Sequence, residues 1–319
     1  MHFDTYEIER QVIAFMEASG ITPPRDGLIL DGQKHRYQVE TDRHGAKSGV
    51  YCIYPDGWPA GWVQDFHLGD PITWKFDASG LDSNTRAEWK RRAASPEAVA
   101  AREAKKAEGQ TLRQNERAAK LKAAFEAYRA ARGIEEACDH GYLLAKHVTP
   151  RGGFLIGGKH RGLRVGSMVS SKGTMMNDLL LIPMMDVRTG RFCALHRVFG
   201  RPGADGKFGK GWCTPAGGVF PIGTDLSSGP VFVCEGVSTG LALYDYLIDE
   251  LNELSATVLM AMDAGNLTRQ AAVIRERYAG RELYAAIDDD EAGRKVAATC
   301  REAKFNGIIM PPLACREAV

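Results

Sequence analysis

The chain has 319 residues, of which 44% are hydrophobic and 25% are charged, and its formal net charge is +1. These values are ordinary for a soluble protein of two or three domains. No apolar run approaches the roughly 20 residues of a membrane span, which excludes an integral helical membrane protein. The first ten residues carry acids and no hydrophobic segment, so we expect no signal peptide.

The cysteines predict a cytoplasmic protein with reduced thiols. None belongs to a C-x-x-C pair, and their number is odd, which argues against a disulfide scaffold or a zinc ribbon. They are Cys52, Cys138, Cys193, Cys213, Cys234, Cys300 and Cys315.

The charge is unevenly distributed along the chain. Residues 86–132 hold thirteen basic and six acidic side chains, and residues 151–215 hold eleven and three. Residues 231–299 reverse the balance, with six basic and twelve acidic side chains. Such a pattern fits metal ions together with a polyanion, but it also fits ordinary solvated faces.

The first 82 residues predict a helix followed by a small β-rich module. Apolar residues at helical spacing predict a helix over 4–19, which ends at Gly20. The stretches "HRYQVE", "GVYCIY", "GWVQDF" and "ITWKF" then read as short strands separated by Gly and Pro.

Two further regions precede the C-terminal part. Residues 83–132 are rich in Ala, Arg, Lys and Glu, which predicts a basic helical connector, interrupted or restarted near Pro96 and Gly109. Residues 133–228 predict a mixed α/β subdomain with the strands "LRVGSMV", "DLLLIPMMD" and "RFCALHRVF". Between the last two strands, "VRTG" predicts a hairpin turn.

Residues 229–319 alternate apolar strands with helical stretches. The strands are "VFVCEG", "ATVLMAMD", "ELYAAIDDD" and "GIIM", which predicts an α/β domain with a parallel sheet and flanking helices. Functional groups of such sheets collect at the carboxyl ends of the strands. Four carboxylates have this position: Glu235, Asp263, Asp288 and Asp290.

Taken singly, an acid at a strand end is more often a helix cap or a loop residue. Acids from different strands can converge, however, and would then raise one another's pKa unless a cation is present. Mg²⁺ prefers oxygen ligands, usually one or two carboxylates with waters and phosphates. Asp288 and Asp290 flank the spacer Asp289, and Glu291 reads as a first-turn acid of the next helix.

The pair Glu235-Gly236 and the later D-x-D-x-x-G motif of Asp288, Asp290 and Gly293 resemble the TOPRIM domain. That domain occurs in bacterial-type primases, type IA and type II topoisomerases, OLD-type nucleases and RecR-type repair proteins. Type IA topoisomerases continue the motif with an acid where this chain has Ala292, and the glycine that follows is similar to the primase pattern.

The region before the acids also resembles primases. "LLLIPMMDVRTGRFCALHRVF" looks like the basic subdomain that precedes TOPRIM in them, and "HGYLLAKHV" and "MDAGNL" have counterparts in primases of phages, plasmids and integrated mobile elements. The resemblance covers most of residues 135–310 and, more loosely, residues 20–80. It implies a DNA primase that makes short primers on a single-stranded DNA template from nucleoside triphosphates, with a replicative helicase fused downstream or separate.

The resemblance also implies roles for individual residues. Asp288 and Asp290 would hold Mg²⁺ or Mn²⁺, Glu235 would be a further ligand or the base, and Asp263 would either assist or be a loop acid. Gly236 and Gly293 are the motif glycines. Nucleotide or nucleic acid would contact a set of basic side chains that singly read as ordinary surface charges: Arg197, Lys207, Lys210, Arg161, Arg164 and Lys172.

The N-terminal module departs from replicative primases, which begin with a zinc ribbon. The module contains Cys52 and three histidines, His35, His44 and His67. Their spacing is not that of a four-ligand site, so we predict no zinc. Its aromatic side chains either stack on single-stranded DNA or form the core of the module. They are Tyr37, Tyr51, Tyr54, Trp58, Trp62 and Trp74.

The same sequence features are compatible with two other functions. A TOPRIM nuclease would use the same acids to activate water, and a non-catalytic DNA-binding replication partner would not need them.

Overall fold

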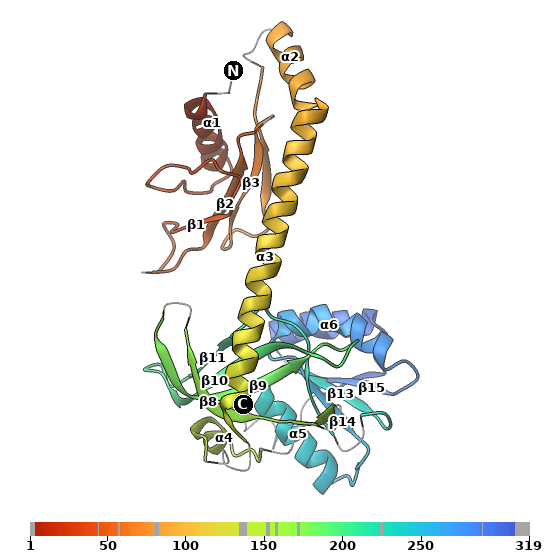
Figure 1. Cartoon of the computed structure of the whole chain (residues 1–319). Coiled ribbons are helices and arrows are strands. Elements are labelled where there is room, and N and C mark those ends of the chain that lie inside the picture. The colour runs from red at the N-terminus through yellow and green to blue at the C-terminus, as the bar shows by residue number, and fades with distance from the viewer. Residues whose placement is uncertain are drawn as a thin grey trace. The chain divides into compact units, whose positions relative to one another are not determined.

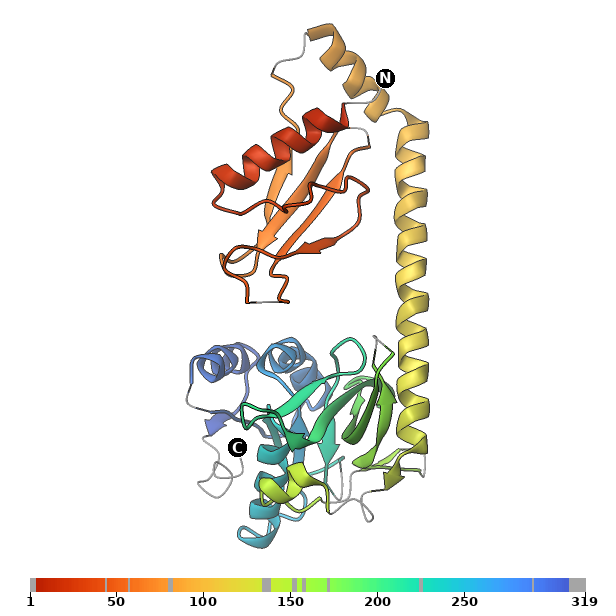
Figure 2. The same ribbon diagram turned by 90° about the vertical axis from the view of Figure 1, so that its left-hand side faces the viewer.

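The computed structural model describes residues 4–43, 45–56, 58–79, 83–133, 139–150, 154–156, 159–170, 173–223, 226–288 and 290–309. The chain divides into two compact units, Met1–Thr111 and Leu112–Val319 (Figures 1 and 2).

The N-terminal unit contains a helix and a four-stranded antiparallel sheet, as predicted. Helix α1 (Thr5–Ala18) begins after Asp4, whose carboxylate accepts a hydrogen bond from the backbone N–H of Tyr6. The strands are β1 (His35–Tyr37), β2 (Gly49–Tyr54), β3 (Ala60–Asp65) and β4 (Ile72–Lys75), and they pair in chain order.

Helix α1 covers one face of this sheet, and the aromatic residues divide between the two faces. Ile8, Val12 and Met16 of α1 are buried in one cluster with the inward side chains of the strands. Three of the six aromatics, Tyr37, Tyr51 and Trp74, are buried in that cluster, and Trp58 packs against it; Tyr54 and Trp62 occupy the outward positions of β2 and β3.

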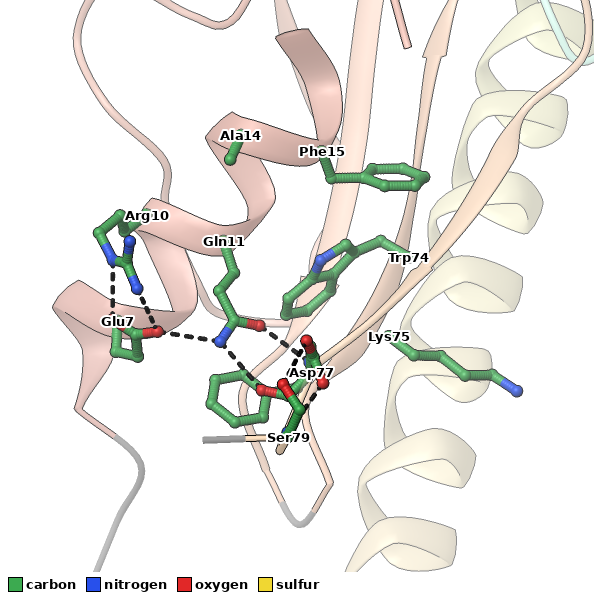
Figure 3. Close-up of a pocket in the computed structure, with 10 residues that line it drawn as sticks. Glu7, Arg10, Gln11, Ala14, Phe15, Trp74, Lys75, Asp77 and Ser79 are labelled. Carbon is green, nitrogen blue, oxygen red and sulfur yellow. Dashed lines mark hydrogen bonds and ion pairs between the residues drawn. The ribbon is translucent and has the colours of Figure 1, made fainter. Parts of the chain in front are cut away.

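The side chain of Gln11 ties α1 to the residues that follow β4. Its Nε2 donates to the carbonyl of Asp77 at 3.1 Å, and its Oε1 accepts from the N–H of Asp77 at 2.8 Å. The Gln11 amide thus pairs with the N–H and the carbonyl of one residue, as a neighbouring strand would. The two hydrogen bonds cross a pocket that is also lined by Glu7, Arg10 and Trp74 (Figure 3).

Two helices follow the module. Helix α2 (Ser83–Ala93) is short, and α3 (Pro96–Ala130) restarts at the predicted proline but continues without interruption through Gly109. The last turns of α3 belong to the second unit, where Ala124 and Tyr128 are buried against strands of its first sheet. The hydroxyl of Tyr128 also donates to the carbonyl of Gly162 at 2.7 Å.

The first sheet of the second unit is antiparallel, with the order β11-β10-β9-β8-β5. Its strands are β5 (Arg132–Gly133), β8 (Arg164–Val169), β9 (Met175–Met185), β10 (Phe192–Pro202) and β11 (Phe208–Trp212). Helix α4 (Gly141–Ala145) and the two-stranded sheet of β6 (Phe154–Ile156) and β7 (Lys159–Arg161) lie between β5 and β8 in the chain.

The predicted hairpin turn between β9 and β10 is confirmed. The N–H of Gly190 donates to the carbonyl of Asp186 at 2.8 Å, and Gly190 has a φ of +66°. Glycine accepts this left-handed conformation without steric cost.

The second sheet of this unit contains the four predicted parallel strands and one addition. The order is β12-β14-β13-β15-β16, with β13 (Val231–Cys234), β14 (Thr257–Met260), β15 (Leu283–Ala286) and β16 (Gly307–Ile309) parallel. Strand β12 (Phe220–Ile222) pairs antiparallel with β14. It comes from residues that we assigned to the preceding subdomain.

Helices cover both faces of the parallel sheet. Helix α5 (Val237–Asp249) packs on one face together with residues of the antiparallel sheet, in a single apolar cluster. Helices α6 (Ala264–Arg277) and α7 (Glu291–Glu302) pack on the other face. The side chains of β13 and β14 alternate between the two clusters, as expected for strands buried on both sides.

Asn266 joins the start of α6 to two other segments. The side chain is fully buried, and its Nδ2 donates to the carbonyls of Gly218 and Ala261, both at 2.8 Å. Gly218 precedes β12 and Ala261 follows β14. The amide of Asn266 therefore holds the start of the edge strand β12 against the end of β14.

We expect Asn266→Ala to lower the free energy of unfolding by about 2 to 4 kcal/mol, because two buried carbonyls lose their donor. Chemical denaturation of the full chain measures the change. Thr268→Ala, an exposed change on the same helix, serves as the control. Equal stability of the two variants would contradict the assigned role of Asn266.

Candidate functional site

The three carboxylates that follow strands lie at the carboxyl ends of the parallel strands. We call this end of the sheet, with Glu235, Asp263, Asp288 and Asp290, the acidic edge. Glu235 directly follows the central strand β13, and Asp288 follows β15 on one side of it. Asp263 follows β14 on the other side. The chain passes from β13 to β14 and then returns across β13 to β15, so the strand order reverses between β13 and β15. In open α/β sheets, ligands bind at this switch point.

Asp290 is fixed by the helix that it begins. It is the N-cap of α7, and its Oδ1 accepts a hydrogen bond from the N–H of Gly293 at 2.7 Å. A Cβ atom at Gly293 would collide with the backbone carbonyl of Asp288. The motif glycine therefore allows the start of α7 to pack against the turn that carries Asp288; Asp289 is outside the described residues.

Gly236 has a different role from Gly293. It is the N-cap of α5, with a φ of −91° that any residue adopts. Its backbone conformation does not require glycine.

Asp263 is held by two hydrogen bonds. Its Oδ1 accepts from the N–H of Asn266 at 2.6 Å, which makes it the N-cap of α6, and its Oδ2 accepts from the indole N–H of Trp212 at 2.8 Å. Because Trp212 ends β11, this bond links the antiparallel sheet to the acidic edge. Both oxygens of Asp263 thus have a structural partner.

The acids are close enough to affect one another's protonation. Burial, and then the negative charges of Asp288, Asp290 and Asp263 in that order, raise the pKa of Glu235 to about 6. Burial and the three neighbouring carboxylates thus both favour the protonated form of Glu235.

The residues of this edge fit a divalent cation of the Mg²⁺ type. Among the residues that the structure describes, no group of three or more His, Cys, Asp or Glu side chains is arranged so that it could hold a metal ion by itself. Mg²⁺, however, is commonly held by one or two carboxylates together with substrate phosphates. The donors are hard oxygens, and a cation would relieve the repulsion at Glu235.

The predicted basic residues of β10 and β11 face opposite sides of the antiparallel sheet. In the β10–β11 pairing, Val198 lies opposite Lys210 and Arg197 lies opposite Gly211. Residues opposite each other share a face and neighbours along a strand do not. Lys210 is therefore on the same face as Trp212, whereas Arg197 is on the other face, 5.5 Å from the ring centre of Phe199.

Lys210 and Lys146 form a small cationic group near the acidic edge. Burial lowers the pKa of Lys210, and burial and then the charge of Lys210 lower the pKa of Lys146. The ammonium nitrogen of Lys210 lies 5.5 Å from the ring centre of Tyr142. Sequence reasoning did not find Lys146, because it follows α4 and comes near Lys210 only through the fold.

Trp212 and His196 were also not predicted. Their rings meet edge to face at 5.1 Å, and burial lowers the pKa of His196 to about 4, so its imidazole is neutral near pH 7. The charges of both Asp263 and Lys210 act on His196, so this aromatic pair lies near both the acidic and the basic groups. Their spacing in the sequence, 16 residues apart on two strands, gave no signal for this contact.

Arg164 and Lys207, the other predicted basic residues whose side chains are described, have different positions. Arg164 donates from Nη1 to the carbonyls of Tyr128, Arg129 and Ala131 at 3.0–3.4 Å, and so it satisfies the C-terminal end of α3. Lys207 is exposed before β11. Arg161 ends β7, where only its backbone is described, and Lys172 is outside the described residues.

The chain is similar in sequence to DNA primases. It is 37% identical over 83 residues to a DNA primase TraC of Escherichia coli, a match that covers 26% of this chain and 8% of the primase. A second DNA primase TraC of Escherichia coli is 36% identical over 93 residues, which is 29% of this chain and 6% of the primase. The matches thus span less than a tenth of these relatives. No family model matches the chain.

Two solved structures share a distant likeness with the chain. One is of bacteriophage T7 lagging-strand DNA polymerase interacting with primase domains of two gp4 subunits, with a TM-score of 0.32, 19% identity and coverage of 47% of this chain and 71% of that one. The other is the primase fragment of the bacteriophage T7 primase-helicase protein, with a TM-score of 0.31, 15% identity and coverage of 47% and 57%. Scores of this size decide nothing about the site.

The helices that the structure describes include none that is long and apolar enough to cross a membrane.

We expect Glu235→Gln to stabilise the chain in EDTA at about pH 8. The folded pKa of Glu235 is raised from 4.5 to about 6, so its ionised form costs stability above that pH and not below pH 4.5. The free energy of unfolding should rise by about 1 kcal/mol. This is roughly half of what a fully buried carboxylate would give, because solvent partly screens the charge of Glu235. Thermal unfolding measured across pH tests this.

Glu291→Gln is the matched control for that experiment, because Glu291 is exposed and bridges Lys295 at 2.9 Å. It should give no stabilisation at any pH. A gain in stability of Glu235→Gln that persisted unchanged below about pH 4 would show that ionisation of Glu235 is not its cause.

We expect Arg164→Lys to lower the free energy of unfolding by about 1 to 2 kcal/mol, because lysine keeps the charge but cannot reach three carbonyls at once. Its affinity for single-stranded DNA should stay at the wild-type value in an anisotropy titration. Weaker DNA binding with normal stability would restore Arg164 as a nucleic-acid contact.

Proposed function

We propose that the chain is the catalytic part of a DNA primase, which synthesises short primers on a single-stranded DNA template from nucleoside triphosphates. The observation that carries the proposal is the electrostatic coupling of Glu235 to Asp288 and Asp290 at the switch point of a parallel sheet. The sequence similarity to DNA primases supports the same activity. The acidic edge is, on this proposal, a TOPRIM site.

Primer extension is a nucleotidyl transfer. The 3′-hydroxyl of the primer attacks the α-phosphorus of the incoming nucleotide, a new P–O bond forms, and the bond to pyrophosphate breaks. The hydroxyl proton must leave during this step. Glu235 is the carboxylate suited to accept it, because its pKa of about 6 is closer to neutral pH than that of an ordinary glutamate.

Asp288 and Asp290 would hold Mg²⁺ or Mn²⁺ with the phosphates of the substrate. The bound metal would lower the pKa of the attacking hydroxyl and neutralise charge on the phosphate. Asp290 can do this with the oxygen that does not cap α7. Asp263, whose two oxygens already accept hydrogen bonds, would position the edge without binding the metal directly.

Lys210 and Lys146 are the cations that we assign to the triphosphate. Lys210 is exposed and Lys146 is half-buried, and burial and then the charge of Lys210 lower the pKa of Lys146. An anion between the two ammonium groups would stabilise their charged forms. A replicative helicase partner, a role in phage, plasmid or mobile-element replication and a cytoplasmic location rest on the sequence resemblance alone.

The test is synthesis of labelled primers by the full chain on single-stranded DNA with Mg²⁺ and nucleoside triphosphates. We expect Asp288→Asn and Glu235→Gln each to lose about 100-fold or more of the activity, because each removes a charged group from the reacting centre. Glu291→Gln, an exposed neighbour on α7, should keep it.

Thermal unfolding provides a readout that does not depend on turnover. Mg²⁺ should raise the melting temperature of the wild-type chain and not that of Asp288→Asn, since a ligand that binds only the folded state stabilises it. Mg²⁺-dependent cleavage of DNA without primer synthesis would replace the primase with a nuclease. Full biological effect of Asp288→Asn would instead favour a non-catalytic partner.

A further inference from the structure

The face of the N-terminal sheet that α1 does not cover presents aromatic and basic side chains to solvent. We call it the outer face and define it by the outward positions of β1–β4 with the two flanking residues Lys34 and Phe66. Tyr54 and Phe66 are 52% and 50% exposed, and Trp62 is partly exposed. None of these three rings belongs to the buried cluster of the inward face, although Val50 and Cys52 at outward positions are buried.

The rings of the outer face stand above short neighbours. In the sheet register, Trp62 lies between Cys52 of β2 and Thr73 of β4. Both of these side chains are small, and Cys52 is buried. The indole therefore projects from the middle of the sheet, where a flat ligand can reach it.

Cations accompany two of the rings. The ammonium nitrogen of Lys34 lies 5.5 Å from the ring centre of Trp62, and the guanidinium of Arg36 lies 5.1 Å from that of Phe66. Such contacts hold each charge beside an aromatic surface. A nucleic-acid strand, in which bases and phosphates alternate, could therefore contact one ring and one cation at Trp62 with Lys34 and again at Phe66 with Arg36.

The charge of this face is opposite to that of the rest of the module. Residues 1–82 hold seven basic and thirteen acidic side chains. The outward strand positions nevertheless carry Arg36 and Lys75 and no acid. A basic surface on an acidic module selects an anionic partner.

We propose that the outer face binds single-stranded DNA by stacking unpaired bases on Trp62 and Phe66, with Lys34 and Arg36 on the phosphates. Sequence-tolerant binding of single strands combines these two elements, a basic track and aromatic platforms. A duplex keeps its bases stacked inside and could not use the rings. The choice of DNA rests on the proposed function, in which the strand would be the template.

The test is an anisotropy titration of the full chain with fluorescein-labelled oligothymidine, in EDTA and without nucleotides. The double variant Trp62→Ala/Phe66→Ala should bind about tenfold or more weakly, because each stacked base contributes about 1 to 3 kcal/mol. Trp62→Leu, which keeps the apolar cover of the sheet, should also weaken binding. Thermal unfolding verifies that each variant is folded.

Two controls separate stacking from general effects. Tyr6→Ala removes an aromatic side chain on α1 that is 71% exposed, and it should leave the affinity unchanged. Lys34→Gln/Arg36→Gln should weaken binding and reduce the slope of log affinity against log salt by about 0.7 for each phosphate that the variant no longer neutralises.

The outcomes distinguish this proposal from the primase proposal. Unchanged affinity of the folded double variant, or an equal loss of affinity for duplex DNA, would overturn the outer face as a single-strand site. Tighter binding of the matching single-stranded RNA would overturn the choice of DNA. Because no metal or nucleotide is present, these results do not depend on whether the acidic edge catalyses synthesis.

Discussion

The repulsion among carboxylates at the end of the parallel sheet is the constraint on which the second unit depends. Glu235, Asp288 and Asp290 are placed near one another by backbone geometry, and burial keeps water from screening Glu235 completely. A fold that served stability alone would separate these charges. The helices on both faces and the capping bonds at α6 and α7 supply the packing that holds the acids in place.

The antiparallel sheet contributes to this arrangement through contacts rather than through a separate core. Its residues share one apolar cluster with α5 and with the parallel sheet. Trp212 reaches Asp263 from β11, and Asn266 reaches the segment before β12. The acidic edge and Lys210 of β11 are thus parts of one packed structure, which brings charges of both signs to the same region.

The two faces of the small sheet in the N-terminal unit have different roles. One face of the sheet is closed by α1 and contains Tyr37, Tyr51 and Trp74, which give the module a core. The opposite face keeps its rings in contact with solvent and with cations. The same residue types therefore stabilise the fold on one side and provide a binding surface on the other.

The sequence by itself determined the elements and the carboxylates at the strand ends, because strand and helix periodicity and capping are local properties. It did not determine β12, the two faces of the aromatic module, or the side of the sheet on which Arg197 and Lys210 lie. Only the tertiary structure decided these, since strand register and packing join residues far apart in the chain. The tertiary structure also placed Arg164 at the end of α3, because the sequence does not distinguish a solvated surface charge from a side chain that caps a helix.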